Sequence, residues 1–165
     1  MNAKAIVYTS NTGYTARYAA LLSEKLGVPA HTLSEAQKAL PAGTPIIYMG
    51  WLMAGSVKGC RKAAKRFAIE AVIGVGLGDT GAQDEAARKS CGLPAEVPVF
   101  TVQGGMDINK LKGPYKLVIR MLTKAMASKK DATPGEARMA ELLQAGGDFV
   151  SEKELAAVLA WAGKK

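Results

Sequence analysis

The strongest constraint on the fold is a regular alternation between short apolar runs and helical patterns. Five runs rich in valine, isoleucine and tyrosine cover residues 4–9, 28–33, 45–50, 70–76 and 97–103. Most of them are continuously apolar, which is typical of strands that are covered on both faces. Strands joined by right-handed helical crossovers form a parallel sheet, so the sequence predicts a doubly wound α/β fold.

Four helical patterns fill the connections, at residues 15–26, 34–40, 58–68 and 83–90. Gly27 follows the first pattern, at the position where a left-handed residue commonly ends a helix. Ser34 and Gln37 have the spacing of a capping box, in which two side chains satisfy the first turn of a helix. We therefore expect the second helix to open at Ser34.

The region after the fifth run is longer than one closing helix requires. A helical pattern covers residues 107–128, with Gly113-Pro114 as a point of interruption, and further capping boxes pair Thr133 with Glu136 and Ser151 with Glu154. We predict that residues 107–150 form a helical insertion and that a helix of residues 151–162 closes the fold. No linker or repeat divides the sequence, so residues 1–165 are expected to form one domain.

Charge and cysteine content narrow the classes of ligand. The chain has 22 basic and 14 acidic side chains, and the net charge of +8 favours anionic ligands, acidic partners or phospholipid headgroups. Nucleic acid is not expected, because aromatic residues that could stack on bases are not interleaved with the basic ones. Cys60 and Cys91 are far apart in sequence and the chain has one histidine, so free thiols and no metal site are predicted. Without a recognisable signal peptide or transmembrane run, a cytoplasmic location is expected.

The loop after the first run has the composition of a phosphate cradle. It reads Thr9-Ser10-Asn11-Thr12-Gly13-Tyr14-Thr15. Small hydroxyl side chains and a glycine let backbone N–H groups converge, and the next helix directs its positive end to the same point. The loop matches neither GxxxxGK(S/T) nor GxGxxG, so a single phosphomonoester fits best. The alternative is an ordinary helix cap, which draws on the same residue types.

Two further loops are expected beside this cradle, because ligands of doubly wound sheets bind beyond the carboxyl ends of the strands. The third run leads into Gly50-Trp51-Leu52-Met53-Ala54-Gly55, and the fourth leads through Gly76-Leu77 into Gly78-Asp79-Thr80-Gly81. Apolar side chains at a strand end indicate a flat apolar ligand, for which Trp51 offers a stacking face. The alternative is that Trp51 and Leu52 continue the strand into the core.

Together the three loops resemble those of the flavodoxin family. Residues 10–15 match the flavodoxin pattern S/T-x-S/T-G-x-T, which wraps the phosphate of FMN, and residues 76–79 resemble the G-x-G-D loop at the pyrimidine edge of the flavin. The resemblance implies FMN as cofactor, a five-stranded sheet of order 2-1-3-4-5, and a site built from these loops. The implied site residues are Ser10, Asn11, Thr12, Gly13, Tyr14, Thr15, Gly50, Trp51, Leu52, Met53, Ala54, Gly55, Gly78, Asp79, Thr80 and Gly81.

The sequence departs from flavodoxins in two respects. No aromatic residue follows Asp79, where flavodoxins often carry a tyrosine on the outer face of the ring, and the chain is basic where electron-shuttling flavodoxins are acidic. Residues 104–107, 115–122 and 151–161 are loosely similar to the C-terminal third of bacterial menaquinone-dependent protoporphyrinogen oxidases. Those FMN enzymes deliver electrons to membrane quinones, but they carry a long insertion around the fifth strand that is missing here.

Basic residues recur on one face of two helical patterns. These residues are Lys58, Arg61, Lys62, Lys65 and Arg66 in the first pattern, and Lys112, Lys116, Arg120 and Lys124 in the second. The second set accompanies many apolar residues and predicts a helix at an anionic membrane surface. A solvated basic face over a packed apolar face is the alternative.

Three functional hypotheses follow from the sequence. The leading one is a flavodoxin-like FMN-binding redox protein that carries electrons from a reduced donor to a partner protein or quinone, with no dedicated catalytic acid or base. It would be cytoplasmic or peripheral on the inner face of the membrane. The second is a quinone-linked, protoporphyrinogen-oxidase-like flavoenzyme at the membrane surface. The third is a flavin-free interaction module that binds an acidic partner through its basic helices.

Overall fold

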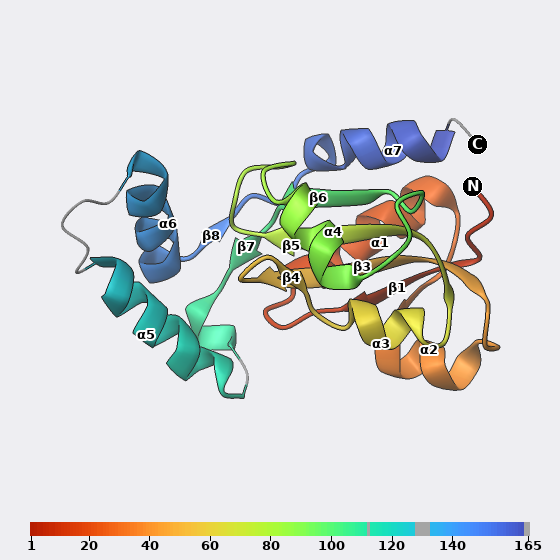
Figure 1. Cartoon of the computed structure of the whole chain (residues 1–165), viewed down its shortest axis with the longest axis horizontal. Helices are drawn as coiled ribbons and strands as arrows, with labels where there is room; N and C mark the ends of the chain where they lie inside the picture. Colours follow the sequence, from red (N-terminus) through yellow and green to blue (C-terminus); the bar gives the residue numbers. More distant parts are fainter. Residues whose placement is uncertain (112, 128–132, 164–165) are drawn as a thin grey trace.

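A computed structural model describes residues 1–111, 113–127 and 133–163 (Figure 1). The strands are β1 (Ala5–Thr9), β2 (Ala30–Thr32), β3 (Pro45–Met53), β4 (Ser56–Val57), β5 (Ala68–Gly76), β6 (Val99–Gln103), β7 (Gly105–Met106) and β8 (Gly147–Asp148). The α-helices are α1 (Tyr14–Leu26), α2 (Leu33–Ala39), α3 (Cys60–Ala64), α4 (Asp84–Cys91), α5 (Tyr115–Ala127), α6 (Pro134–Ala145) and α7 (Ala156–Gly163). Two short 3₁₀ turns are η1 (Ile108–Lys110) and η2 (Glu152–Leu155).

The predicted α/β class with a mainly parallel sheet is confirmed. The parallel strands lie in the order β2-β1-β3-β5-β6, and β4 pairs antiparallel with the end of β3. This sixth strand was not predicted. It forms because the chain reverses at Ala54 and Gly55, which both have positive φ angles, of 49° and 71°.

Residues of the central strands face two separate cores, as expected for a sheet that is covered on both sides. Ile46 and Tyr48 belong to a core that includes residues of α2, α3 and α4. Ile47 and Met49 belong to a second core that includes residues of α1, η2 and α7. Successive strand residues point to opposite faces, so the continuous apolar run serves both cores.

The two cysteines lie in the first of these cores. Cys60 on α3 and Cys91 on α4 are buried and free, as predicted. A hydrogen bond with the Cys91 thiol, together with burial, raises the pKa of Cys60, while the same hydrogen bond lowers the pKa of Cys91. The Cys60 thiol therefore stays protonated, which suits a packing role.

Two of the predicted boundaries are wrong for local reasons. β3 continues to Met53 because Trp51 pairs with Val75 of β5, and the next two residues pair with β4. The third helical pattern is shorter than predicted, because α3 ends at Ala64 and β5 begins at Ala68. The pattern of residues 107–128 divides into η1 and α5 around the predicted interruption at Gly113-Pro114, and its last residue lies outside the described ranges.

Helix caps also differ from two of the predictions. Thr32 caps α2 in place of Ser34: its Oγ1 accepts from the Glu35 amide at 3.2 Å, and Glu35 accepts from the Thr32 amide at 2.9 Å. Two overlapping sequences fit the capping pattern, and the one at the end of β2 prevails. Ser151 makes no side-chain cap, and the predicted closing helix of residues 151–162 begins as the 3₁₀ turn η2 and becomes α-helical only at Ala156. The predicted box of Thr133 at the start of α6 is confirmed.

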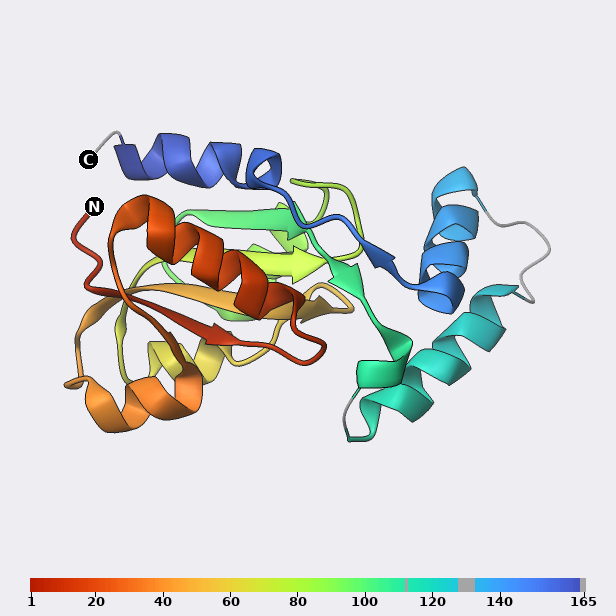
Figure 2. The same cartoon turned by 180° about the vertical axis from the view of Figure 1, so that it is seen from behind.

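The predicted insertion projects from the sheet on a two-stranded antiparallel ribbon, β7 and β8 (Figure 2). At the end of the ribbon α5 packs against α6, and η1 lies next to α6. None of the helices in the described ranges combines the length and apolar character that crossing a membrane requires. The chain then returns through β8 to η2 and α7, which lie on the same face of the sheet as α1 and contribute Leu155 and Val158 to the second core (Figure 2).

Tyr18 of α1 joins this returning segment to the sheet. Its ring is fully buried, its hydroxyl donates to the Gln103 carbonyl, and the Ser151 amide donates to the hydroxyl oxygen at 3.4 Å. Burial raises the pKa of Tyr18 from 10.0 to about 12. The phenolate form is therefore disfavoured in the folded protein.

We predict that the protein loses stability as the pH rises from 10 to about 12. Below this window the tyrosine is protonated in both states, whereas within it only the unfolded state ionises freely, so unfolding becomes easier. The Tyr18 share is about 2 kcal/mol after allowance for solvent near the hydroxyl. In urea denaturation over this pH range, the free energy of unfolding should fall less steeply with pH for Tyr18→Phe than for the wild type. Equal pH dependence for the two proteins would contradict the raised pKa of Tyr18.

Candidate functional site

The three loops singled out in the sequence meet at one end of the sheet. Thr9, at the end of β1, is in register with Gly50 of β3, which is in register with Gly74 of β5. Because these strands are parallel, their carboxyl ends point the same way. The predicted site residues are thereby brought to neighbouring positions along one edge of the sheet (Figure 1).

The first loop reaches α1 through an uncapped helix start. Gly13 adopts a φ of 102° at the N-cap position, and no side chain caps the helix. The Ser10 hydroxyl accepts from the Gly13 amide at 3.2 Å, which curls the loop. That hydroxyl keeps its own proton for donation to a ligand. Thr15 is almost fully buried in the first turn of α1, so its hydroxyl lies deeper than the loop.

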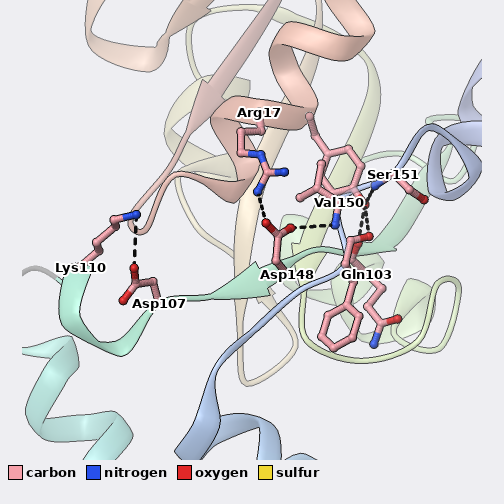
Figure 3. Close-up of polar contacts among 9 residues, drawn as sticks. Arg17, Gln103, Asp107, Lys110, Asp148, Val150 and Ser151 are labelled. Carbon is pink, nitrogen blue, oxygen red and sulfur yellow. Dashed lines mark hydrogen bonds and ion pairs between the residues drawn. The ribbon is translucent and has the colours of Figure 1, made fainter.

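Tyr14 faces the ribbon of the insertion. A Cβ atom on Gly105 would lie 2.5 Å from the Tyr14 ring, so the ring packs directly on β7. The Arg17 guanidinium lies 5.6 Å from the centre of the same ring and binds Asp148 of β8 at 2.6 Å (Figure 3). Arg17 holds the pKa of Asp148 below its usual range. The start of α1 is thus fixed to both strands of the ribbon.

A cavity of about 450 Å³ lies between the start of α1 and the insertion. Its lining includes Tyr14, Met106, Asn109 and Gln144. It adjoins the first loop through Tyr14, and sequence analysis did not anticipate it. Its walls come from segments that only the ribbon brings together.

The second predicted loop is a strand end and a tight hairpin. A Cβ atom on Gly50 would lie 2.5 Å from the Lys58 carbonyl oxygen, so the hairpin closes against one side of Gly50. Leu52 covers the glycines of the next strand, at 3.0 Å from a Cβ atom built on Gly74. The turn itself consists of Ala54 and Gly55. The strand continues through Trp51 and Leu52, as the alternative interpretation predicts, but both side chains are only partly buried and Trp51 stays at the surface of the sheet end.

Trp51 is half-buried at the end of β3, where two residues contact its ring. The Tyr115 ring of α5 meets it edge-on, with centroids 4.8 Å apart and planes at 86°. The Lys58 ammonium group lies 5.9 Å from the centre of the ring. An edge-on aromatic pair and a nearby cation both stabilise a ring at the surface.

The third loop is tied to the sheet by its hydroxyl and backbone groups. The Thr80 hydroxyl accepts from the Gln103 amide at 2.9 Å and also bonds to Glu154 of η2. The Gly81 amide donates to the carbonyl of Thr101 at 2.9 Å. Through these hydrogen bonds, Thr80 and Gly81 fix the third loop to β6 and η2.

The other two residues of this loop have different surroundings. A Cβ atom on Gly78 would lie 3.0 Å from the Gln83 side chain. The Asp79 carboxylate is exposed, and Arg138 of α6 lies 3.9 Å from it. Asp79 therefore faces α6 of the insertion.

Tyr115 and Arg138 are the residues that sequence analysis missed. Both belong to the insertion, and each contacts a residue of a predicted loop, Trp51 and Asp79 respectively. No local pattern marks them, because the contacts depend on the direction in which the ribbon carries the helices. Together they place α5 and α6 over the sheet edge that the three loops form (Figure 1).

This edge combines a helix N-terminus and hydroxyl groups, which can bind phosphate, with a half-buried tryptophan, whose ring can stack on a flat ligand. Within the described ranges, no three His, Cys, Asp or Glu side chains gather closely enough to hold a metal ion.

We predict that Tyr115→Ala exposes Trp51 to water. The substitution removes the ring that covers one edge of Trp51, so its fluorescence should shift to longer wavelength. The second tryptophan, Trp161, packs near Phe100, and a Trp161→Phe background leaves Trp51 as the only tryptophan. Tyr115→Phe is the control and should leave the spectrum nearly unchanged. An unshifted spectrum for Tyr115→Ala would show that the two rings are not in contact.

We predict that Gly50→Ala destabilises the protein by about 1–3 kcal/mol, the usual cost of overpacking. The added methyl group meets the Lys58 carbonyl and the Val57 side chain, so the hairpin must shift. Gly135→Ala is the control, because no atom lies within 4 Å of its added Cβ on α6. Thermal denaturation compares the two variants. A wild-type melting temperature for Gly50→Ala would rule out the close approach of the hairpin.

Comparisons with protein-family models, with curated proteins and with solved structures give no match.

Proposed function

We propose that the chain is a flavodoxin-like FMN-binding redox protein that carries electrons between a reduced donor and an acceptor protein or quinone. The main support is the convergence of a hydroxyl-rich helix start, a tryptophan and a glycine-aspartate loop at one sheet edge. In the flavodoxin fold that we propose, ligands bind at this edge because the strand order reverses beside β1.

The first loop suits the phosphate group of FMN. The uncapped start of α1 leaves its first amide groups directed at the loop, and nothing lies within 4 Å of a Cβ built on Gly13. A ligand can therefore approach the backbone there. Ser10 and Thr12 would add hydroxyl donors, and the positive end of α1 would favour the dianion.

The other two loops suit the flavin ring. Trp51 would offer an aromatic surface, and the backbone around Gly78 and Asp79 would bind the polar edge of the ring. Tyr115 lies edge-on against Trp51 and would extend this aromatic surface beside the ring. Bound FMN would supply the one- and two-electron redox chemistry, while the chain binds and orients it.

A quinone-linked, protoporphyrinogen-oxidase-like activity is a second candidate. One observation favours it. The insertion that precedes η2 and α7 reaches the proposed flavin edge, where it could help to bind a bulky or lipid-soluble substrate. Oxidation of protoporphyrinogen with a menaquinone analogue as acceptor tests this activity. Failure to oxidise it would leave electron transfer to another acceptor as the proposal.

Purification tests the cofactor directly. We expect a yellow protein, or a colourless one that takes up added FMN with a change in the flavin spectrum. A colourless protein that binds no FMN would refute the proposal. It would favour a flavin-free interaction module with an acidic partner.

We predict that Thr12→Glu weakens FMN binding by about tenfold to a hundredfold, because a carboxylate would then face the phosphate. Riboflavin, which lacks the phosphate, should be affected by less than about threefold on the same reasoning. Ser34→Glu is the matched control, since Ser34 is an exposed hydroxyl residue in the first turn of another helix, α2. Fluorescence titration with both flavins measures the affinities. Equal losses for FMN and riboflavin would place the phosphate elsewhere.

A further inference from the structure

The outer face of α5 carries four exposed large hydrophobic side chains. Leu117 is 63% exposed, Val118 39%, Met121 64% and Leu122 45%. Among the described residues, no other large hydrophobic side chain is exposed to this degree. Contiguous apolar patches of this kind mark sites of interaction with proteins or membranes.

The opposite face of α5 is turned toward α6. Ile119 and Thr123 line a cavity of about 310 Å³ together with Leu143 of α6 and Ile108 of η1, and the basic side chains of Arg120 and Lys124 line it as well. With about 3.6 residues per turn, the exposed hydrophobic residues lie on the side of the helix that faces away from α6. The inner side of α5 thus packs with α6, whereas these four hydrophobic side chains remain exposed.

A row of basic residues borders the apolar patch. Lys116, Arg120 and Lys124 follow each other at a spacing of four, which places them along one side of α5. The helix contains no acidic residue. Lys112, the fourth member of the predicted basic face, lies outside the described residues. The basic row therefore lies between the exposed apolar patch and the inner cavity, which Arg120 and Lys124 also line.

The position of α5 makes this surface accessible. The ribbon of β7 and β8 carries α5 away from the sheet, and α5 lies at the outside of the molecule in both views (Figures 1 and 2). The helix approaches the sheet through Tyr115, in its first turn. Docking through Leu117 and Met121, on the other side of the helix, leaves that contact in place.

We infer that the outer face of α5 docks on the surface of an anionic lipid membrane. Apolar side chains enter the boundary between headgroups and acyl chains, while adjacent lysine and arginine side chains bind lipid phosphates. Each basic residue near such a surface strengthens binding by about fivefold. The combination distinguishes α5 from α3, which is also basic but carries no exposed large hydrophobic residue.

Charge argues for lipid over a second copy of the chain. A symmetric pair of α5 helices would bring two basic rows near each other in a protein of net charge +8. Anionic headgroups instead neutralise the row while the apolar side chains are buried. The inference does not depend on FMN, because no residue of the proposed flavin site contributes to the patch.

Vesicle flotation tests the inference on the full chain. We expect binding to mixed phosphatidylcholine–phosphatidylglycerol vesicles, little binding to pure phosphatidylcholine, and a loss of binding at high salt. A double variant, Leu117→Gln with Met121→Gln, removes two residues of the apolar patch. A triple variant, Lys116→Gln with Arg120→Gln and Lys124→Gln, removes the basic row. Each variant should reduce partitioning into the anionic vesicles at least about tenfold.

A third variant is the charge-matched control. Lys62→Gln, Lys65→Gln and Lys89→Gln remove three exposed lysines from α3, the turn after it and α4, and should reduce binding much less. Circular dichroism confirms that each variant is folded. Equal binding to neutral vesicles, or equal losses for the control and the α5 variants, would overturn the inference. So would a wild-type dimer that Leu117→Gln with Met121→Gln converts to a monomer, since a second copy would then cover the face.

Discussion

The pairing of β3 with three other strands is the constraint on which the rest of the structure depends. β3 lies between β1 and β5 in the parallel sheet, and its end also pairs with β4. Parallel pairing directs the loops after β1 and β5 to the same edge as the hairpin of β3. Gly50 permits this arrangement, since a larger residue would meet the hairpin that folds back over it. The candidate site is therefore a consequence of how one central strand is shared.

The sequence predicts the sheet well because each central strand is apolar on both faces, and few other structures accommodate such runs. It fails where two patterns compete. The apolar residues Trp51 and Leu52 fit a ligand-binding loop as well as a strand, and the pairing partners that decide between them come from distant segments. At α2 two overlapping capping sequences compete, and the end of β2 selects Thr32.

Of the candidate site, only the three loops can be predicted from the sequence. Each loop comes directly after a strand of the parallel sheet, so the fold brings the loops close together. Tyr115 and Arg138 reach the same edge from the insertion, and their positions depend on the ribbon. The ribbon is in turn fixed by the Arg17–Asp148 ion pair (Figure 3) and by the packing of Tyr14 on Gly105. Contacts of this kind carry no periodic signal.

The insertion connects the two proposals through a single helix. Tyr115, at the start of α5, contacts Trp51 at the proposed flavin edge, and residues 116–124 of the same helix carry the exposed apolar residues and the basic row. A lipid surface at α5 would therefore lie within one helix diameter, about 10 Å, of the aromatic pair. That separation suits electron transfer from the flavin to a quinone dissolved in the membrane, without entry of the sheet into the lipid. It also accounts for a basic net charge in a protein whose proposed relatives, the soluble flavodoxins, are acidic: a carrier that serves a membrane acceptor gains from attraction to anionic lipid.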